Sequence, residues 1–217
     1  MMIPAVITTF PRQINGQPYK YRETTFDSLR RAGFTEIFTS MGQGNPRVDW
    51  ATAALIGMQC PIEHSHVLIV QDDITLTSSI YPFLEELTER WPRDVGCLSL
   101  YTGDKYLMDA KSPGFKAPDA NTWGACALLL PVEALRRLVT SDKYLRYPGK
   151  KDIDQAIGHA LADWESWGYE FWYLFPSAVQ HVGHVSTLCD SPAAGWRQAS
   201  SYRGEHASCD IWKSLWS

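Results

Sequence analysis

Short apolar runs alternate with amphipathic stretches along the first half of the chain. The apolar runs have the length and composition of buried strands. We expect strands at residues 5–10, 36–40, 66–70 and 95–101. Apolar residues at helical spacing predict the intervening helices, over residues 21–33 and 50–59 and from Ser78 onward. This order of strand and helix predicts a mostly parallel sheet that is covered by helices on both faces.

Individual residues mark the limits of these helices. The third helix shows the clearest spacing, because its apolar residues follow positions i, i+3, i+4 and i+7: Ile80, Phe83, Leu84 and Leu87. Gly33 is placed to end the first helix. Asp49 is placed to cap the second helix, after a loop at 42–47 that is rich in turn residues.

The pattern changes after residue 101. Residues 102–122 lack periodicity, and a loop of this length in a compact domain is usually functional. Beyond this loop we expect strands at 123–131 and 169–175, helices at 132–139 and 152–164, and an irregular tail from Pro176. No internal repeat, low-complexity segment or linker interrupts the sequence, so we expect a single domain over residues 1–217.

Composition narrows the class of protein. The chain has 217 residues, 45% of them hydrophobic and 20% charged, with a formal net charge of −4. The acidic balance argues against a broad basic surface for nucleic acid or an anionic membrane. No apolar run approaches the roughly 18 residues of a membrane span, and we see no signal peptide. We therefore expect a cytoplasmic protein with no membrane partner.

The cysteines are scattered and odd in number: Cys60, Cys97, Cys126, Cys189 and Cys209. None of them forms a CxxC pair. This spacing predicts reduced thiols in the core, not a disulfide framework or a zinc site.

Two adjacent carboxylates, Asp72 and Asp73, end the apolar run at residues 66–70. In open α/β sheets, ligands bind beyond the carboxyl ends of the strands. Neighbouring carboxylates repel unless a cation or hydrogen-bond donors neutralise them, and hard divalent cations prefer oxygen ligands. The acids therefore indicate a metal site. The alternative is a solvated turn in which one acid caps the next helix.

The stretch VLIVQDD, residues 67–73, resembles the DXD or EDD motif of GT-A fold nucleotide-sugar glycosyltransferases, with Gln71 in place of the first acid. The resemblance implies a single α/β domain with a mostly parallel central sheet flanked by helices. Residues 1–101 would form the nucleotide-sugar-binding half, and residues 102–217 the acceptor and catalytic half. Asp73 would be a metal ligand, and Asp72 a second ligand or a contact to the donor ribose.

Other segments resemble the same family in the same order. The stretch VITTFPR resembles its entry strand, which makes Thr8, Thr9 and Arg12 candidate donor contacts. The stretch WGACALLLP resembles its acceptor-side strand, whose candidate residues are Trp123, Gly124 and Ala125. Small residues there also fit plain packing beneath a helix.

The stretch DIDQAIGHAL resembles the xED motif, in which an acid at the start of a helix is the catalytic base. Asp154 is the better candidate, because apolar Ile157 and Leu161 follow it at the offsets of the motif. Asp152 could help to cap the helix and bind the acceptor. Acids in a first helical turn also have a simpler explanation, since they stabilise the helix dipole.

The tail PSAVQHVGH resembles the segment that supplies a further metal ligand in this family, with His181 the better match and His184 the second. If the strand at 169–175 lies beside and parallel to the strand at 66–70, its exit brings His181 to Asp73. Asn45 and Arg47 could contact the diphosphate or sugar, or belong to an ordinary surface loop. We expect His64 and His66 to form a surface turn.

These features predict a metal-dependent glycosyltransferase of the hexosyltransferase type that inverts the anomeric configuration of the sugar. Asp154 would be the base, and Mn²⁺ or Mg²⁺ the cofactor. An imidazole ligand favours Mn²⁺. The expected donor is a UDP-sugar. The acceptor stays open among a glycan, a protein, a small molecule and a modified DNA base, in a bacterial or phage-infected cytoplasm. Two alternatives remain: a metal-dependent hydrolase using Asp72, Asp73, His181 and His184, and a catalytically inactive nucleotide-sugar-binding module.

Overall fold

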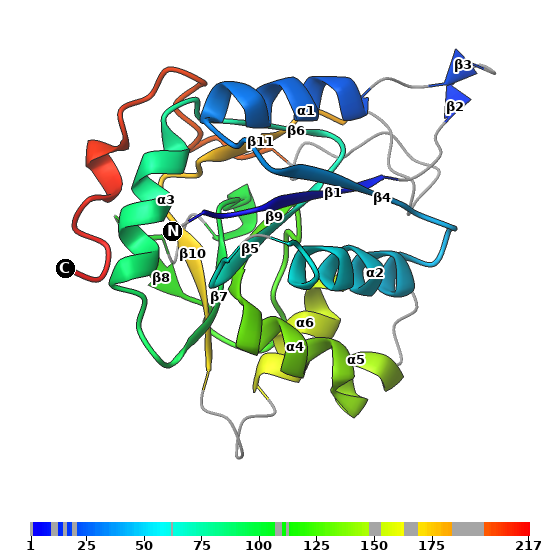
Figure 1. The fold of residues 1–217 in the computed structure, drawn as a ribbon. Helices are drawn as coiled ribbons and strands as arrows, with labels where there is room; N and C mark the ends of the chain where they lie inside the picture. The colour runs from blue at the N-terminus through cyan, green and yellow to red at the C-terminus, as the bar shows by residue number, and fades with distance from the viewer. Residues whose placement is uncertain are drawn as a thin grey trace.

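A computed structural model describes most of the chain, namely residues 2–9, 13–14, 17–18, 21–61, 63–106, 110–111, 113–147, 153–162, 169–183 and 198–217. Its centre is a seven-stranded sheet with the strand order β4-β1-β5-β9-β7-β10-β8 (Figure 1). The strands are β1 (Ala5–Thr9), β4 (Ile37–Met41), β5 (His66–Gln71), β7 (Val95–Ser99), β8 (Gly114–Lys116), β9 (Ala127–Pro131) and β10 (Glu170–Leu174).

The expected mostly parallel sheet flanked by helices is confirmed. Strand β1 pairs in parallel with both β4 and β5, and β7 pairs in parallel with β10. Strand β9 lies antiparallel between β5 and β7, and β8 is antiparallel to β10 at one edge. Five of the seven strands therefore run in one direction, and only β8 and β9 oppose them.

Helices cover both faces of the sheet (Figure 1). Helices α1 (Tyr21–Ala32) and α3 (Ile80–Glu89) lie on one face; α2 (Pro46–Met58), α4 (Val132–Thr140), α5 (Asp142–Arg146) and α6 (Ile153–Ala162) lie on the other. Successive strand residues point to opposite faces, so Leu68 and Val70 join the first core and Val67 and Ile69 join the second. Burial on both faces explains the continuous apolar runs of the strands.

Two small sheets lie outside the main one. Strands β2 (Gln13–Ile14) and β3 (Gln17–Pro18) form one, and β6 (Ile74–Leu76) pairs antiparallel with β11 (Val179–His181) in the other. The expectation of an irregular tail from Pro176 was therefore wrong for β11. It was also wrong for the 3-10 helix η3 (Cys209–Trp212), whose Trp212 is fully buried and donates from Nε1 to the Pro176 carbonyl at 2.8 Å.

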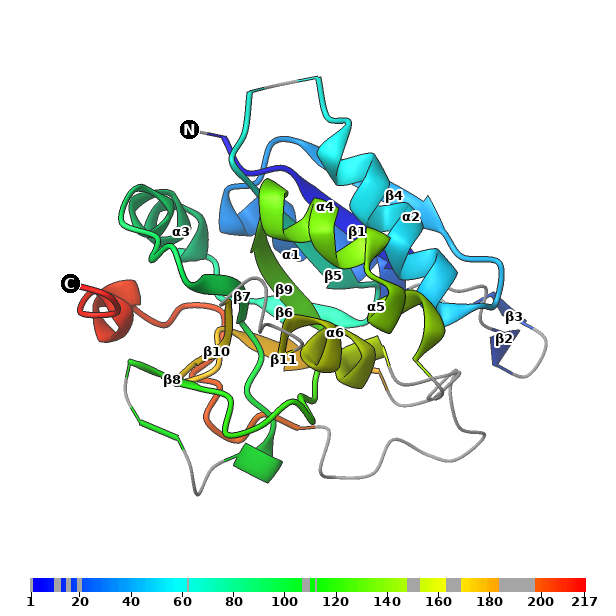
Figure 2. The same cartoon turned by 90° about the horizontal axis from the view of Figure 1, so that it is seen from below.

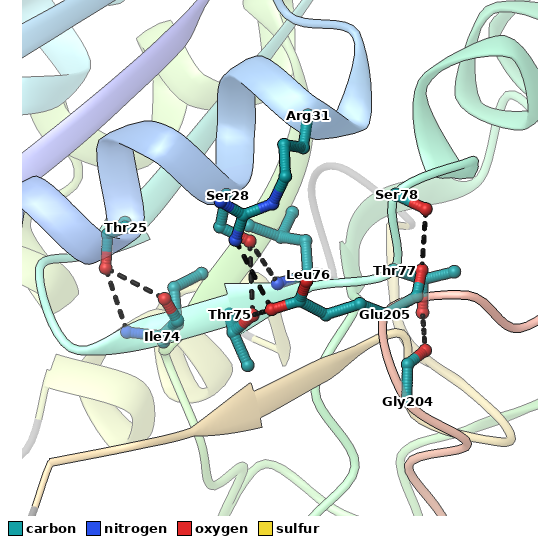
Figure 3. Close-up of polar contacts among 10 residues, drawn as sticks. All are labelled: Thr25, Ser28, Arg31, Ile74, Thr75, Leu76, Thr77, Ser78, Gly204 and Glu205. Atoms are coloured by element: carbon teal, nitrogen blue, oxygen red, sulfur yellow. Dashed lines mark hydrogen bonds and ion pairs between the residues drawn. The ribbon is translucent and has the colours of Figure 1, made fainter.

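Polar side chains fix β6 from two sides (Figure 3). Thr25 Oγ1 of α1 accepts from the Ile74 amide at 3.0 Å, and Ser28 Oγ accepts from the Leu76 amide at 2.8 Å. From the C-terminal segment, Glu205 accepts from Thr75 Oγ1 at 2.9 Å through Oε1. These contacts hold the chain that follows Asp73 in one place.

Several local expectations were wrong. Helix α2 begins at Pro46 with Asn45 as its N-cap, so Asp49 lies within the helix and instead accepts from the backbone amides of Gln43 and Gly44 at 2.8 and 3.1 Å. His66 is buried in β5 against the Trp91 ring, 4.5 Å between centroids, and is not part of a surface turn. The loop at 102–122 contains β8 and the 3-10 helix η1 (Asp104–Tyr106), and helix α5 was not expected.

Cys60, Cys97 and Cys126 are buried and have reduced thiols, as expected, whereas Cys209 is reduced and half-buried. Cys189 lies outside the described residues. Among the helices that the structure describes, none is long and apolar enough to cross a membrane.

Candidate functional site

The candidate residues gather at one edge of the sheet, where β5 ends and β9 begins. The antiparallel pairing of these strands places Ala127 opposite Val70, and the Gln71 amide donates to the Cys126 carbonyl at 2.8 Å. Asp73 lies two residues after Gln71 in the chain, and Gly124 lies two residues before Cys126. The DXD-like stretch and the acceptor-side stretch therefore share the carboxyl edge of β5.

Asp72 and Asp73 are both buried, with 4% and 2% of their surface exposed. The alternative of a solvated turn is therefore wrong for this pair. Asp73 Oδ2 lies 3.1 Å from His181 Nε2, and both side chains are almost completely buried. The Val182 amide also donates to the Asp73 carbonyl at 2.8 Å. The structure thus brings together an acid and a histidine that are 108 residues apart in the sequence.

The path that brings His181 to Asp73 differs from the expected one. Strand β10 does not lie beside β5, because β9 and β7 separate the two. It does run in the same direction as β5, so it leaves the sheet at the same edge. The chain then turns back as β11 and pairs with β6, which places His181 opposite Ile74.

Gly183 packs closely against this pair. A Cβ atom on Gly183 would lie 2.9 Å from His181 Cε1 and 3.0 Å from Asp73 Cγ, closer than ordinary contacts allow, and nearer still to Asp73 Oδ2. Only glycine therefore fits here without moving the carboxylate or the ring. The backbone of Gly183 therefore packs directly against both polar groups.

The pair fits a divalent metal. Two ligand atoms at right angles, each about 2.1 Å from an octahedral ion, lie about 3.0 Å apart, close to the separation of Asp73 Oδ2 and His181 Nε2. A carboxylate oxygen and an imidazole nitrogen together suit a metal such as Mn²⁺. Within the described ranges, no group of three or more His, Cys, Asp or Glu side chains is placed to hold a metal.

Asp154 lies in the first turn of α6, as expected, and its carboxylate faces the start of β9. Its Oδ2 accepts from the Gly124 amide at 2.9 Å, and its carbonyl accepts from Thr122 Oγ1. Gly124 has a positive φ of 88°, and a Cβ there would lie 2.6 and 2.9 Å from the Tyr101 ring. The glycine is therefore required both for the backbone conformation and for the contact with Tyr101.

Tyr173 holds the segment that carries Gly124. Its buried hydroxyl accepts from the Trp123 amide at 3.0 Å and donates to the Trp123 carbonyl at 3.2 Å. Burial raises the pKa of Tyr173 well above its usual value, so the hydroxyl stays neutral and keeps its proton. Ala125, the third acceptor-side candidate, is buried in the core beneath α6.

The donor candidates that the structure describes make internal hydrogen bonds at the same edge. Thr8 Oγ1 donates to the Val70 carbonyl at 3.1 Å, and Thr9 Oγ1 donates to the Ser40 carbonyl at 3.2 Å. Asn45 Oδ1 accepts from the Val48 amide at 3.4 Å as the cap of α2. Arg47 Nη1 donates to the Tyr147 carbonyl at 2.6 Å. These contacts give each residue a structural role, and donor binding by them stays a prediction.

Arg12, Asp152 and His184 lie outside the described residues. Sequence reasoning missed Gly183 and Tyr173, although each touches the backbone or side chain of a predicted site residue. The glycine between two histidines was a signal that could have been used for Gly183. For Tyr173 the sequence offered none, because an aromatic residue in a strand is ordinary core.

Neither a family model nor a curated protein sequence matches the chain. Among solved structures, A197 from STIV matches with a TM-score of 0.51 at 12% identity, over 83% of this chain and 84% of A197. A Drosophila β-1,4-galactosyltransferase, solved with manganese, UDP-Gal and xylobiose, gives a TM-score of 0.47 at 13% identity, over 84% of this chain and 71% of that one. Mouse xyloside xylosyltransferase 1 gives 0.41 at 10% identity, over 78% and 84%.

At these identities the likeness concerns the fold. The chain has an α/β fold similar to that of A197, and the solved structures that resemble it include glycosyltransferases and a nucleotidyltransferase.

Proposed function

We propose that this protein is a metal-dependent glycosyltransferase that moves a sugar from a UDP-sugar to an acceptor hydroxyl with inversion at the anomeric carbon. The observation that carries the proposal is the buried Asp73–His181 pair, 3.1 Å between Oδ2 and Nε2, against which the Gly183 backbone packs closely. A buried carboxylate at the carboxyl end of a central strand is expensive unless a ligand or a hydrogen bond uses it.

Asp73 and His181 would hold the metal, Mn²⁺ in preference to Mg²⁺ because one ligand is nitrogen. When bound, such an ion neutralises the charge that develops on the leaving diphosphate. Asp72, buried beside Asp73, is the proposed second ligand or ribose contact.

Asp154 is the proposed general base. The Gly124 amide holds its Oδ2 at 2.9 Å and so fixes the carboxylate in one orientation. The carboxylate would accept the proton of the acceptor hydroxyl as the hydroxyl oxygen bonds to the anomeric carbon. The bond from the anomeric carbon to the phosphate oxygen breaks with its electron pair leaving on the nucleoside diphosphate. The proton then passes from Asp154 to water.

The proposal is tested by release of UDP from a panel of UDP-sugars, with Mn²⁺ and with a pool of acceptors. We expect release that needs Mn²⁺, that rises with the correct acceptor, and that is lost in Asp73→Asn while the variant stays folded. Release without acceptor dependence would indicate a hydrolase. Donor binding without any release would indicate an inactive binding module.

A further inference from the structure

Helices α5 and α6 lie on the same face of the sheet as α2 (Figure 2). Residues at these two helices line a groove of about 390 Å³. It is lined by Asp142, Lys143, Arg146, Tyr147 and His159. We propose that this groove binds the acceptor of the transfer, and that the acceptor carries a phosphate group and a ring that can pack against an aromatic side chain. This inference rests on the proposed function, because it assigns the substrate class of that reaction.

The charges of the groove favour an anion. Among the described residues that line it, Lys143 and Arg146 are cations and Asp142 is an acid, in a chain whose overall charge is negative. Arg146 pairs with Asp142 at 3.4 Å, but about four-fifths of each side chain is exposed. Such surface pairs contribute little to stability, so the guanidinium can turn to a ligand at small cost. A guanidinium with a neighbouring ammonium group is a suitable phosphate site.

Two aromatic rings also line the groove, and a stacking contact and hydrogen bonds hold both in place. The rings of Tyr147 and His159 stack with 5.3 Å between their centroids and 30° between their planes. Tyr147 donates from its hydroxyl to Gln155 Oε1 at 2.9 Å, and His159 Nε2 lies 3.2 Å from Asn121 Oδ1. Fixed rings beside cations can pack against a nucleobase or a sugar ring while the cations bind its phosphate.

The position of the groove connects it with the proposed base. His159 lies five residues after Asp154 on α6, which is about 7.5 Å along the helix axis. Gln155, the partner of Tyr147, is the residue next to Asp154. Arg47 holds the Tyr147 carbonyl at 2.6 Å and so ties the groove to the start of α2 at the carboxyl edge of β4. His159 lies about 140° around the helix from Asp154, so the link between them is the segment at 121–124, which contacts His159 through Asn121 and Asp154 through Gly124. An acceptor that follows this segment from the groove would place a hydroxyl at Asp154.

Isothermal titration calorimetry of the full chain, without donor or Mn²⁺, tests the inference. The probes are thymidine 5′-monophosphate, thymidine, glucose 6-phosphate and inorganic phosphate. We expect each phosphorylated ring compound to bind at least ten times more tightly than thymidine or inorganic phosphate. The tighter of the two tells whether the ring is a base or a sugar, and a short oligonucleotide then tells a free nucleotide from one in a strand. Equal affinity for thymidine and its monophosphate would overturn the inference.

Variants locate the binding. Lys143→Gln with Arg146→Gln should weaken binding of the better probe at least tenfold. The matched control is Arg136→Gln with Lys213→Gln, which removes the same charge from two other exposed ion pairs. His159→Ala should reduce the advantage of the ring compound over inorganic phosphate. If the groove variant binds the probe as tightly as the control does, the inference is wrong.

Failure of this inference and failure of the proposed function give different results. Mn²⁺-dependent binding of a UDP-sugar should be lost in Asp73→Asn and unchanged in the groove variant. If the donor binds in this way and the phosphorylated probes do not, the groove assignment fails alone. If the probes bind and no UDP-sugar does, the proposed transfer fails.

Discussion

Gly124→Ala should damage both stability and catalysis, for reasons that can be separated. Gly124 has a φ of 88°, and the left-handed conformation costs an L-residue roughly 1–2 kcal/mol. The added Cβ would also lie 2.6 Å from the Tyr101 ring, and overpacking of this kind costs typically 1–3 kcal/mol. The free energy of unfolding should therefore fall by about 2–5 kcal/mol.

Gly44 provides a matched control. Its φ is 93°, nearly that of Gly124, but a Cβ there would meet no atom within 4 Å. Gly44→Ala should therefore lower the free energy of unfolding by only about 1–2 kcal/mol, the cost of the backbone conformation alone. Urea denaturation followed by circular dichroism measures both variants at equilibrium. Equal losses in the two variants would refute the contact with Tyr101.

The same pair of variants tests the link to Asp154. A displaced Gly124 amide no longer holds Asp154 Oδ2, so kcat should fall by about tenfold or more while Mn²⁺-dependent donor affinity changes little. Gly44→Ala should leave both quantities near their original values. A Gly124→Ala variant with unchanged kcat would show that this hydrogen bond does not position the base.

Three further predictions follow from individual residues. Asp154→Asn should lower kcat by roughly 10²–10⁴-fold with little change in donor affinity, and a product that retains the anomeric configuration by proton NMR would contradict its role as base. Tyr173→Phe should lower the free energy of unfolding by about 1–3 kcal/mol, because the Trp123 amide loses its acceptor; an unchanged free energy of unfolding would contradict this. Burial lowers the pKa of His66 from 6.5 to about 4, so stability should be full above pH 6.5 and fall by up to about 3 kcal/mol as the pH drops towards 4. His66→Phe should flatten that part of the urea-derived pH profile, and a profile identical to that of the unmodified chain would contradict the assignment.

The sequence predicted the main sheet well because its strands are buried on both faces. Strands β1, β5 and β7 are continuous apolar runs, and α3 shows a clear helical spacing, so type and order were readable. The direction of β9 was not readable, because an apolar run looks the same whichever way it pairs. The antiparallel direction of β9 matters, because it places Gly124 at the same edge of the sheet as Asp73.

The short elements could not be predicted from local pattern. Strands β6 and β11 have three residues each and lie more than 100 residues apart, so neither shows a periodicity of its own. They form because Thr25 and Ser28 of α1 satisfy one side of β6 and β11 satisfies the other. The sequence nominated Asp73 and His181 separately, by resemblance, and only the pairing of these strands places one against the other.

The location of Asp49 shows how side chains compete for a helix start. Both Asn45 and Asp49 can cap a helix. Asn45 is the N-cap because Pro46, which follows it, fits the first helical position. Asp49 instead accepts hydrogen bonds from the loop amides of Gln43 and Gly44. Spacing alone could not decide between them.

The central claim is that Asp73 and His181 hold the metal of a nucleotide-sugar site, and Mn²⁺ binding in the presence of UDP tests it most directly. Electron paramagnetic resonance of free Mn²⁺ during a titration gives the affinity and the number of sites. We expect one site in the unmodified chain, at least a hundredfold weaker binding in Asp73→Asn, and weaker binding in His181→Ala with a narrower preference for Mn²⁺ over Mg²⁺. The control variant Asp94→Asn, at an exposed acid, should bind like the unmodified chain. If Asp73→Asn binds Mn²⁺ and UDP as tightly as Asp94→Asn does, the assignment of this site is wrong.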